Sequence, residues 1–482
     1  MKKIFVLTCL MSVCGISAFS QNEVDAIRYS LKQTPATARS LGMGGAFGAL
    51  GADVSSFYTN PAGIGLYKRG GVEISFGLND QFTSTSYEGK QSDNGRSHFH
   101  LNNLGMIGSA SEKTGDWKAF NFGVTYAKTN DFYENFTIQG KSESSLLNPF
   151  VVQANGIRPE ELSDAFPFTA GLGYVSWLIN PSDSIGSSYY STSSGENTQK
   201  KNVTRTGSMG ETAFGFGANY RDFLFFGATL NFQSIRFQEK GSYSETYDST
   251  QPITSFQYND HLRSDGTGVN LKLGVLVKPS EWMRIGAAYH TPTRITMHEI
   301  YAVDITTTPD LGGEREYKSP DLITDYSIRT PSVAMANAAF ILGKTGTISA
   351  DYEYTNYDRI KMRGAASNDY DYSSENTVIK TIYRNTHKVR VGLEMRLLGT
   401  YYVRGGAMYQ QNPLVNNAGG ANNPFITYTG GLGFRNDYIC VDIGLGYTEK
   451  NATYYMYDPR FVNAANLDSR LIQGIASFGY RF

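Results

Sequence analysis

Long apolar runs and cysteines are scarce in this chain. After the first twenty residues, no run of about 18 apolar residues occurs, so no transmembrane helix is expected. Of the three cysteines, Cys9 and Cys14 lie in the apolar N-terminal stretch, which leaves Cys440 and excludes a disulfide framework. Charge of one sign is also lacking: 43 basic and 44 acidic residues give a net charge of −1. This balance excludes the basic surface expected of a nucleic-acid-binding protein.

Residues 1–20 are typical of a secretory signal peptide. Two lysines precede an apolar core, and Ala18 and Ser20 are the small residues expected at positions −3 and −1 of a cleavage site before Gln21. Lipidation at Cys14 is the weaker alternative, because Val13 is bulky where lipoprotein signals have a small residue. Removal of the signal gives the mature chain a net charge of −3.

Aromatic residues and glycine are abundant. The chain has 33 Tyr, 28 Phe and 51 Gly, although its mean hydropathy is only −0.34. Such an average is ordinary for a soluble protein. It is also the average of a membrane barrel, whose strands alternate lumen-facing polar residues with lipid-facing apolar ones. Aromatic girdles and tight turns of a barrel account for the composition.

From Gly71 onward the apolar residues recur with a period of two, which indicates strands. Near the C-terminus, Ile439, Ile443 and Leu445 alternate with Cys440 and Asp442. The last strand puts Phe478, Tyr480 and Phe482 on one face. A terminal aromatic on an alternating strand is similar to the signal read by the outer-membrane barrel assembly machinery, whereas a soluble edge strand ending on Phe is the alternative.

The connections between strands alternate in length. We expect roughly fourteen strands, an even number as in bacterial single-chain barrels. Their predicted starts are residues 71, 96, 116, 199, 222, 256, 281, 319, 345, 380, 400, 424, 438 and 468. Every second connection is short, and most of the intervening ones are long, such as 141–198, 302–318, 363–378 and 411–423. This parity predicts a closed antiparallel transmembrane β-barrel over residues 71–482, with tight turns at one end and loops at the other.

Residues 21–70 do not alternate and precede the barrel. Residues 40–52 are dense in Gly and Ala, and the segment that begins at Asp53 ends on Asn60, Pro61, Ala62 and Gly63. Small residues allow close packing in a crowded interior, and Pro61 favours a rigid turn. We therefore expect residues 21–70 to fold into the lumen as a plug, the alternative being a periplasmic extension.

The chain resembles the FadL/TodX family of outer-membrane transporters for hydrophobic compounds. The small-residue run and the Asn60–Gly63 motif carry the resemblance, together with the segments 289–292, 330–332 and 347–358. It implies a fourteen-stranded barrel with an N-terminal hatch. It also implies a monomer in the outer membrane, a hydrophobic ligand such as a long-chain fatty acid, capture of that ligand by extracellular loops, and lateral release beside the hatch.

Two groups of residues are candidates for ligand contact. In the loop 141–198, apolar side chains indicate a binding surface, with the packing of a small loop core as the alternative. Cations on the polar faces of strands are suited to a carboxylate, with pairing to lumen acids such as Asp351, Glu353, Glu394 and Asp442 as the favoured alternative. The candidates are Phe150, Phe166, Phe168, Trp177, Arg284, Lys388 and Arg390.

No motif in the sequence indicates an enzyme or a cofactor. GxSxG, HExxH and Walker A patterns are absent, and Gly42, Gly44 and Gly48 lack the βαβ context of a dinucleotide site. His98 and His100 have no further ligands at metal-binding spacing, so a polar lumen face explains them better. The sequence thus predicts an outer-membrane uptake channel, in contact with membrane lipid. The alternative is a barrel that docks secreted or surface proteins.

Overall fold

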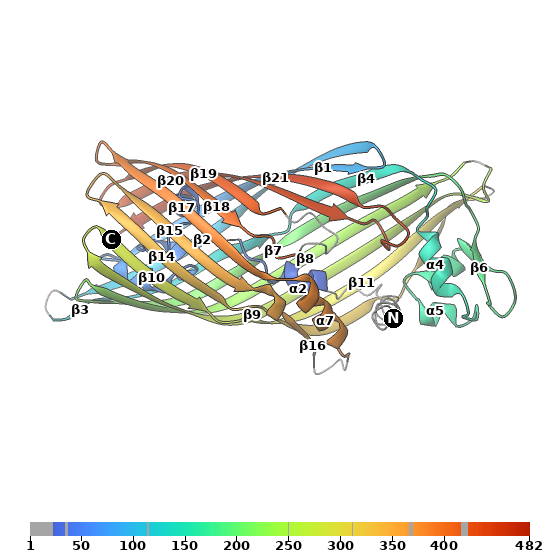
Figure 1. Cartoon of the computed structure of the whole chain (residues 1–482), viewed down its shortest axis with the longest axis horizontal. Coiled ribbons are helices and arrows are strands. Elements are labelled where there is room, and N and C mark those ends of the chain that lie inside the picture. The colour runs from blue at the N-terminus through green and yellow to red at the C-terminus, as the bar shows by residue number, and fades with distance from the viewer. Residues whose placement is uncertain are drawn as a thin grey trace, which may run out of the picture.

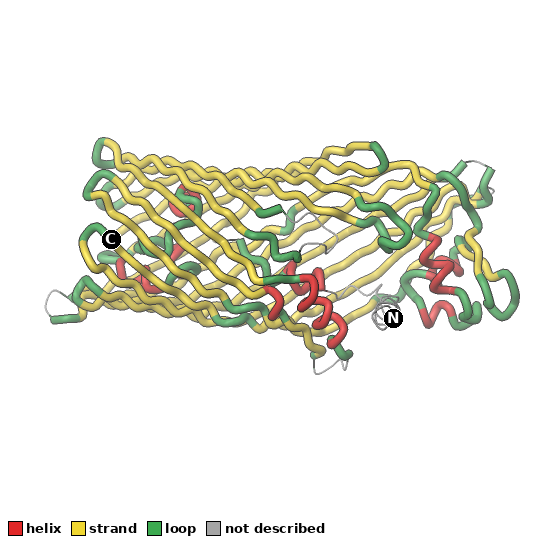
Figure 2. Tube along the Cα trace, viewed as in Figure 1, coloured by secondary structure: helices red, strands yellow, loops and turns green. Residues whose placement is uncertain are grey.

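The computed structural model describes residues 23–33, 37–112, 115–248, 250–310, 312–365, 370–415 and 423–482. The predicted signal peptide lies outside the described residues. One 19-stranded sheet forms an antiparallel barrel, which closes where β21 (Ala465–Arg481) pairs with β1 (Gly71–Tyr87). No described helix is long and apolar enough to cross a membrane. Figures 1 and 2 show the barrel axis horizontally, with the C-terminus at the left end.

The wall has fourteen strands, as the sequence predicts. Ten are single segments: β1, β2 (Lys90–Ser111), β7 (Asn197–Tyr220), β8 (Leu224–Thr246), β9 (Ile253–Ser280), β17 (Asn385–Leu397), β18 (Tyr401–Gln410), β19 (Phe425–Arg435), β20 (Ile439–Tyr454) and β21. Four are interrupted: β3 (Trp117–Asp131) with β4 (Glu134–Ser142), β10 (Met283–His290) with β11 (Arg294–Pro309), β13 (Leu322–Arg329) with β14 (Val333–Leu342), and β15 (Gly346–Asn356) with β16 (Lys361–Gly364).

Most predicted boundaries agree with the structure, and two are wrong. The strand predicted to start at residue 96 begins at Lys90, because its ladder with β1 continues to the pair Tyr87–Lys90. The six predicted short connections, among them Arg221-Asp222 and Asn436-Asp437, all lie at the left end in Figure 1. The strand predicted to start at residue 380 begins at Asn385, because α7 (Ser373–Ile382) precedes it. Its apolar side chains follow helical spacing, and Ile379 is buried against other parts of the chain rather than in a strand.

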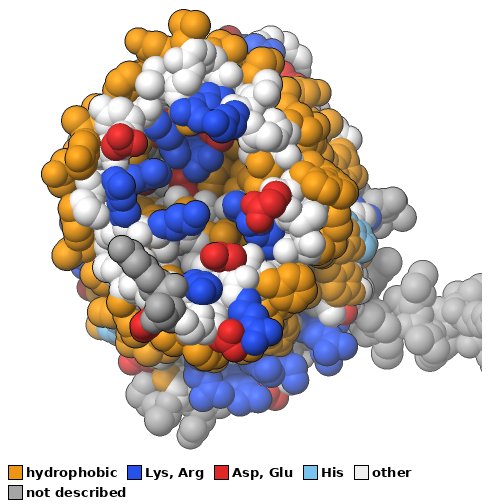
Figure 3. All heavy atoms as spheres, turned by 90° about the vertical axis from the view of Figure 1, so that its left-hand side faces the viewer, with side chains coloured by type: hydrophobic (Ala, Val, Ile, Leu, Met, Phe, Trp, Pro, Cys, Tyr) orange, Lys and Arg blue, Asp and Glu red, His pale blue; other side chains and the backbone are white. Residues whose placement is uncertain are grey.

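The outer surface of the barrel carries a hydrophobic belt. Exposed side chains such as Phe122, Leu230 and Leu445 alternate with buried polar ones on the same strands. Exposed aromatic residues near the short turns form a girdle, which comprises Trp117, Phe120, Phe223, Trp282, Phe340, Tyr401, Tyr438, Tyr480 and Phe482. Figure 3, which views this end, shows hydrophobic side chains around the rim and charged ones around a central hollow. Belt and girdle are typical of a transmembrane barrel.

The N-terminal segment fills the lumen in two layers. Nearest the short turns lie α3 (Ala38–Gly42), η1 (Val54–Phe57) and η2 (Pro61–Leu66), visible as short helices inside the left half of the barrel in Figure 2. Farther along, α2 (Glu23–Arg28) packs against α7, η3 (Tyr357–Arg359) and inward side chains of the wall.

The long loop after β4 folds into a cap at the opposite end. It contains α4 (Leu147–Ala154), α5 (Leu162–Ala165), α6 (Ala170–Val175) and the hairpin β5 (Ile179–Pro181) with β6 (Tyr189–Ser191). A short strand, β12 (Arg315–Lys318), extends β11 at the same end.

Candidate functional site

Small residues allow the plug to contact the wall backbone to backbone. Gly44 has a φ of +65°, and a Cβ there would lie 2.8 Å from the backbone nitrogen of Ala407. Wall glycines provide the matching surface, since a Cβ at Gly227 would overlap the carbonyl of Pro61 and one at Gly274 would overlap the Asn60 side chain. The plug therefore packs against the glycines of the wall strands, and we call this contact surface the seat of the plug.

The motif Asn60-Pro61-Ala62-Gly63 is held by a chain of polar contacts. Asn60 Oδ1 accepts from the Ala62 amide at 3.1 Å, and Asn60 Nδ2 donates to Asn337 Oδ1 at 3.1 Å. Asn337 in turn donates to Asp351 at 2.8 Å. Asp351 Oδ2 accepts from the backbone amides of residues 47 and 48, each at 2.9 Å. The motif thus connects the plug to two neighbouring wall strands.

A buried network of ion pairs fixes the other side of the plug. Arg39 contacts Glu394 through two nitrogens, at 2.9 and 2.7 Å. Glu394 also accepts from Arg404 at 2.6 Å, and Arg404 lies 2.8 Å from Asp442. Asp442 accepts from Arg435 as well, at 2.8 Å. Pairing of this kind offsets the desolvation cost of buried charge.

We expect Gly227→Ala to unseat the plug. The added methyl group cannot coexist with the Pro61 carbonyl, and overpacking of this kind costs about 1–3 kcal/mol. Faster proteolysis of residues 37–66 and a lower unfolding temperature measure the effect. Gly405→Ala is the matched control, because a Cβ there meets nothing within 4 Å. Equal stability of the two variants would contradict this account of the seat.

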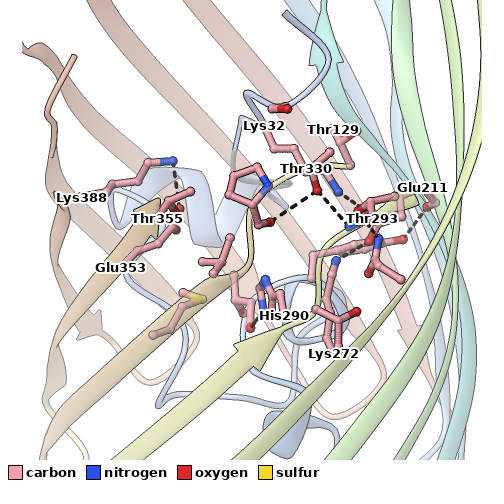
Figure 4. A pocket seen from close by; sticks show the side chains of 18 of the residues that line it. Lys32, Thr129, Glu211, Lys272, His290, Thr293, Thr330, Glu353, Thr355 and Lys388 are labelled. Carbon is pink, nitrogen blue, oxygen red and sulfur yellow. Dashed lines mark hydrogen bonds and ion pairs between the residues drawn. The ribbon is translucent and has the colours of Figure 1, made fainter. Parts of the chain in front are cut away.

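A cavity of about 80 Å³ lies between the residues that follow α2, the residues that follow η1, and the wall (Figure 4). Its charged lining residues form two groups. Glu211 pairs with Lys32 and Lys272, and Glu353 pairs with Lys388 and Arg390. The lining thus holds four cationic side chains and two carboxylates. A volume of this size holds several waters, and the polar walls suit them.

The floor of this cavity comes from the plug. The Tyr58 hydroxyl donates to the carbonyl of Glu211 at 3.1 Å and lies 2.7 Å from Thr125 Oγ1. Burial raises the pKa of the Tyr58 hydroxyl well above its ordinary value, so the group stays protonated. His290 Nε2 lies 2.7 Å from the carbonyl of Thr59. Two consecutive plug residues, Tyr58 and Thr59, therefore contact wall residues that line the cavity.

The predicted lumen cations divide into two groups. Lys388 and Arg390 line the cavity, where they meet Glu353. Arg284 lies elsewhere and donates to the Leu50 carbonyl of the plug. A role in ligand contact stays a prediction for all three, although the structure brings only two of them to one cavity.

The predicted residues of the loop lie in the cap. Phe150 and Phe168 are buried, with rings 6.1 Å from Tyr258 and 5.4 Å from Tyr301, and thereby attach the cap to β9 and β11. Phe166 packs against the same cluster. Trp177 is 61% exposed on the outside of the cap. Their part in ligand capture stays a prediction, and three of the four belong to a packed loop core.

The wall has an incomplete seam beside β2. This strand pairs with β1 from Lys90 to Ile107, but its pairing with β3 stops at Asn103–Ala127. β4 continues to pair with β7, and no ladder joins it to β2 among these fully described strands. Side chains of β1 contact the end of β3 and the start of β4: Asn79 donates to Asp131 at 2.7 Å and Gln81 donates to Glu134 at 2.8 Å. The third wall strand therefore bends inward after Asp131.

Side chains bridge the seam where the backbone does not. Asn94 accepts from the Thr137 amide at 2.8 Å, and Arg96 donates to Asn135 at 2.6 Å. Closer to the bend, the possible ligand atoms of Asp131, His98 and His100 all lie within 4.8 Å of one another, so these residues could together hold a metal ion. The Lys128 ammonium, however, lies 2.8 Å from Asp131 and 3.4 Å from His98 Nδ1. The Lys128 ammonium group therefore already supplies the positive charge beside these three residues.

An apolar layer adjoins the bend at the start of the seam. Phe132, at the bend, packs edge-to-face on Tyr29 and Phe237. Tyr29 is fully buried, and Arg28 stacks over the Phe237 ring at 4.3 Å. Side chains from the N-terminal segment thus occupy the apolar middle of the lumen.

The sequence model of the family described as "Outer membrane protein transport protein (OMPP1/FadL/TodX)" matches residues 30–454, which is most of the chain. The chain belongs to this family. Members of this family are transport channels and not enzymes, and the protein is accordingly an outer-membrane channel for hydrophobic compounds. Among curated protein sequences, none matches this chain.

Solved structures of the family share the fold at low sequence identity. A FadL homologue of Pseudomonas aeruginosa is 13% identical, with a TM-score of 0.55, over 94% of this chain and 99% of that chain. The toluene transporter TodX of P. putida is 12% identical, with a TM-score of 0.52, over 93% and 99%. The toluene transporter TbuX of Ralstonia pickettii is 15% identical, with a TM-score of 0.50, over 93% and 99%.

Several residues of the site were not predicted individually. Lys32 and Arg39 lie in a segment without periodicity, so no strand parity assigns them to the interior. Glu211, Lys272 and Arg404 lie on the polar faces of strands, and that parity is the signal that would have found them.

Proposed function

We propose that the protein takes up small amphipathic molecules, with long-chain fatty acids as the leading class, and releases them sideways through the seam between β2 and β4. The inward bend of the third wall strand is the observation that carries this proposal. Backbone groups facing lipid must be hydrogen-bonded, so a wall without a ladder at this place is costly to maintain. A route from the lumen to the bilayer accounts for that cost.

The cavity supports an acidic head group. Its lining holds four cationic side chains against two carboxylates, an excess that favours an anion. Arg and Lys bind carboxylates through charge-assisted hydrogen bonds. The aromatic layer around Tyr29 and Phe132 lies next to this polar region and suits a hydrocarbon chain.

Transport in this mechanism requires the N-terminal segment to move. Tyr29 and Ala26 are fully buried in the apolar layer, so a ligand can occupy that layer only after α2 leaves it. The cap is the proposed capture surface, with Trp177 exposed on its outside.

Uptake of a labelled long-chain fatty acid tests the proposal. A strain lacking the gene should take up labelled oleate more slowly than the parent, and the intact gene should restore the rate. Labelled toluene, measured in parallel, separates acidic from neutral substrates, because the cationic cavity favours the acid. Normal oleate uptake in the deletion strain would contradict the proposal.

A second candidate function is the docking of secreted or surface proteins. The cap exposes Val152, Val175, Trp177, Ile185 and Tyr190, and exposed apolar surface often marks an interaction site. Normal oleate uptake combined with mislocalised secreted proteins in the deletion strain would favour this function.

A further inference from the structure

Three basic side chains form a row across neighbouring strands on the outer face of the barrel. Arg294 of β11 lies directly opposite Arg329 of β13, and Arg329 lies directly opposite Lys361 of β16. All three are exposed. Among the described residues, none of the three has an ion-pair partner.

Three positive charges side by side repel one another unless an anion neutralises them. Like charges directly opposite each other on adjacent strands destabilise a sheet. Other exposed cations of this wall avoid the problem: Arg263 lies 2.9 Å from Asp265, and Arg470 lies opposite Glu449. The row is thus a local exception, and its charge points to an anionic partner outside the chain.

The row lies just beyond the hydrophobic belt on the side away from the short turns. On the same wall strands, Tyr289, Ala334 and Tyr354 are the last outward apolar side chains before the basic residues, and beyond the row Ile323 of β13 is also exposed. The head-group region extends roughly 5–8 Å beyond the hydrocarbon core, and long basic side chains reach along the surface into it. Head groups of the outer leaflet therefore meet these three residues.

A second cavity, of about 470 Å³, adjoins the row. Lys361, Arg363 and Lys380 contribute its cations, and Ser373 and Thr377 contribute hydroxyl groups. Its described acid, Asp371, already accepts from the amide and hydroxyl of Ser373.

The helix that covers this cavity is held in place by Asn376. Its carboxamide exchanges two hydrogen bonds with the backbone of Met362, at 2.8 and 2.9 Å, and thereby fixes α7 against β16. In Figure 3, Lys and Arg side chains gather along the lower edge of the molecule, the side on which Figure 1 draws β16 and α7.

We propose that this surface binds the phosphomonoester head group of a lipid in the outer leaflet. A phosphomonoester supplies up to two negative charges and three acceptor oxygens, which match a row of two guanidinium groups and one ammonium group. Basic clusters at this depth recognise anionic lipid head groups. The row lies on the outer face of the barrel, outside the lumen.

Lipid retention by the purified protein tests the proposal. In non-ionic detergent, native mass spectrometry should show bound phosphatidic acid, but neither phosphatidylcholine nor diacylglycerol. The triple variant Arg294→Gln, Arg329→Gln and Lys361→Gln should lower the affinity for phosphatidic acid at least about tenfold, since each basic residue contributes to head-group binding. The matched control, Arg263→Gln with Arg470→Gln, removes two cations that face acids and should leave retention unchanged.

Three outcomes would overturn the proposal. These are equal retention of phosphatidic acid by the triple variant, equal retention of diacylglycerol by the natural protein, and displacement of phosphatidic acid by millimolar inorganic phosphate, which would identify a free-anion site. The comparison of lipids on the natural protein does not depend on folding of the variant, so it decides the matter even if the triple variant does not assemble.

Discussion

With cysteines at positions 94 and 137, oxidised protein is expected to lose most of its fatty-acid uptake and to regain it on reduction. Asn94 touches both the backbone and the hydroxyl of Thr137 across the seam, so a disulfide there ties β4 to β2. A covalent tie prevents the seam from widening, and a ligand in the lumen then has no lateral exit. Uptake of labelled oleate by cells, before and after reductant, measures the effect.

A second disulfide provides the control. Thr427 and Thr448 are direct partners on β19 and β20, with hydroxyl oxygens 2.7 Å apart, in a part of the wall that is already fully laddered. Cysteines there should form a disulfide without affecting uptake. The native Cys440 is buried and does not interfere. Full uptake by the oxidised 94–137 variant, with disulfide formation verified by thiol titration, would refute lateral release.

Glu394→Gln is expected to loosen the plug. The carboxylate is shared by Arg39 of the plug and Arg404 of the wall, whose side chains are 15% and 0% exposed. Loss of one partner from a buried ion pair costs about 3–5 kcal/mol, because the remaining charge is left without compensation. We expect a lower unfolding temperature and new conductance for small ions in planar bilayers.

Two further variants test the cause of this effect. Glu196→Gln removes an exposed carboxylate that pairs with exposed Lys141, and it should change neither quantity. In the double variant Arg39→Gln with Glu394→Gln, the loss should be smaller than the sum of the single losses, since both partners are then neutral. Strict additivity would show that Arg39 and Glu394 do not act as a pair.

Alternation along the strands was sufficient for the barrel. Ile439, Ile443 and Leu445 are exposed and Cys440 and Asp442 are buried, as their parity predicts. The parity of short and long connections gave the right strand count, because an antiparallel barrel returns to the same end at every second strand. The strand start at residue 380 was wrong because Ile379 packs against distant residues rather than along a strand.

The functional interior was less accessible to the same reasoning. Parity assigned Lys388 and Arg390 to the lumen, but their partner Glu353 depends on which strands are neighbours. The inward bend after Asp131 has no signature in β3 and β4, because it lies in contacts with β1 and β2. The plug segment has no periodicity, so the pairing of Arg39 with Glu394, 355 positions away, was not predictable.

Side-chain period, turn chemistry and composition are local properties, and they specify a closed fourteen-stranded barrel with a polar interior from the amino-acid order alone. Which charges meet inside, where the wall loses its ladder and which cations line up on the outside arise only when strands distant in the chain become neighbours. The physical reason is that electrostatic contacts and seams depend on cross-strand register, which is a property of the closed barrel and not of any single strand.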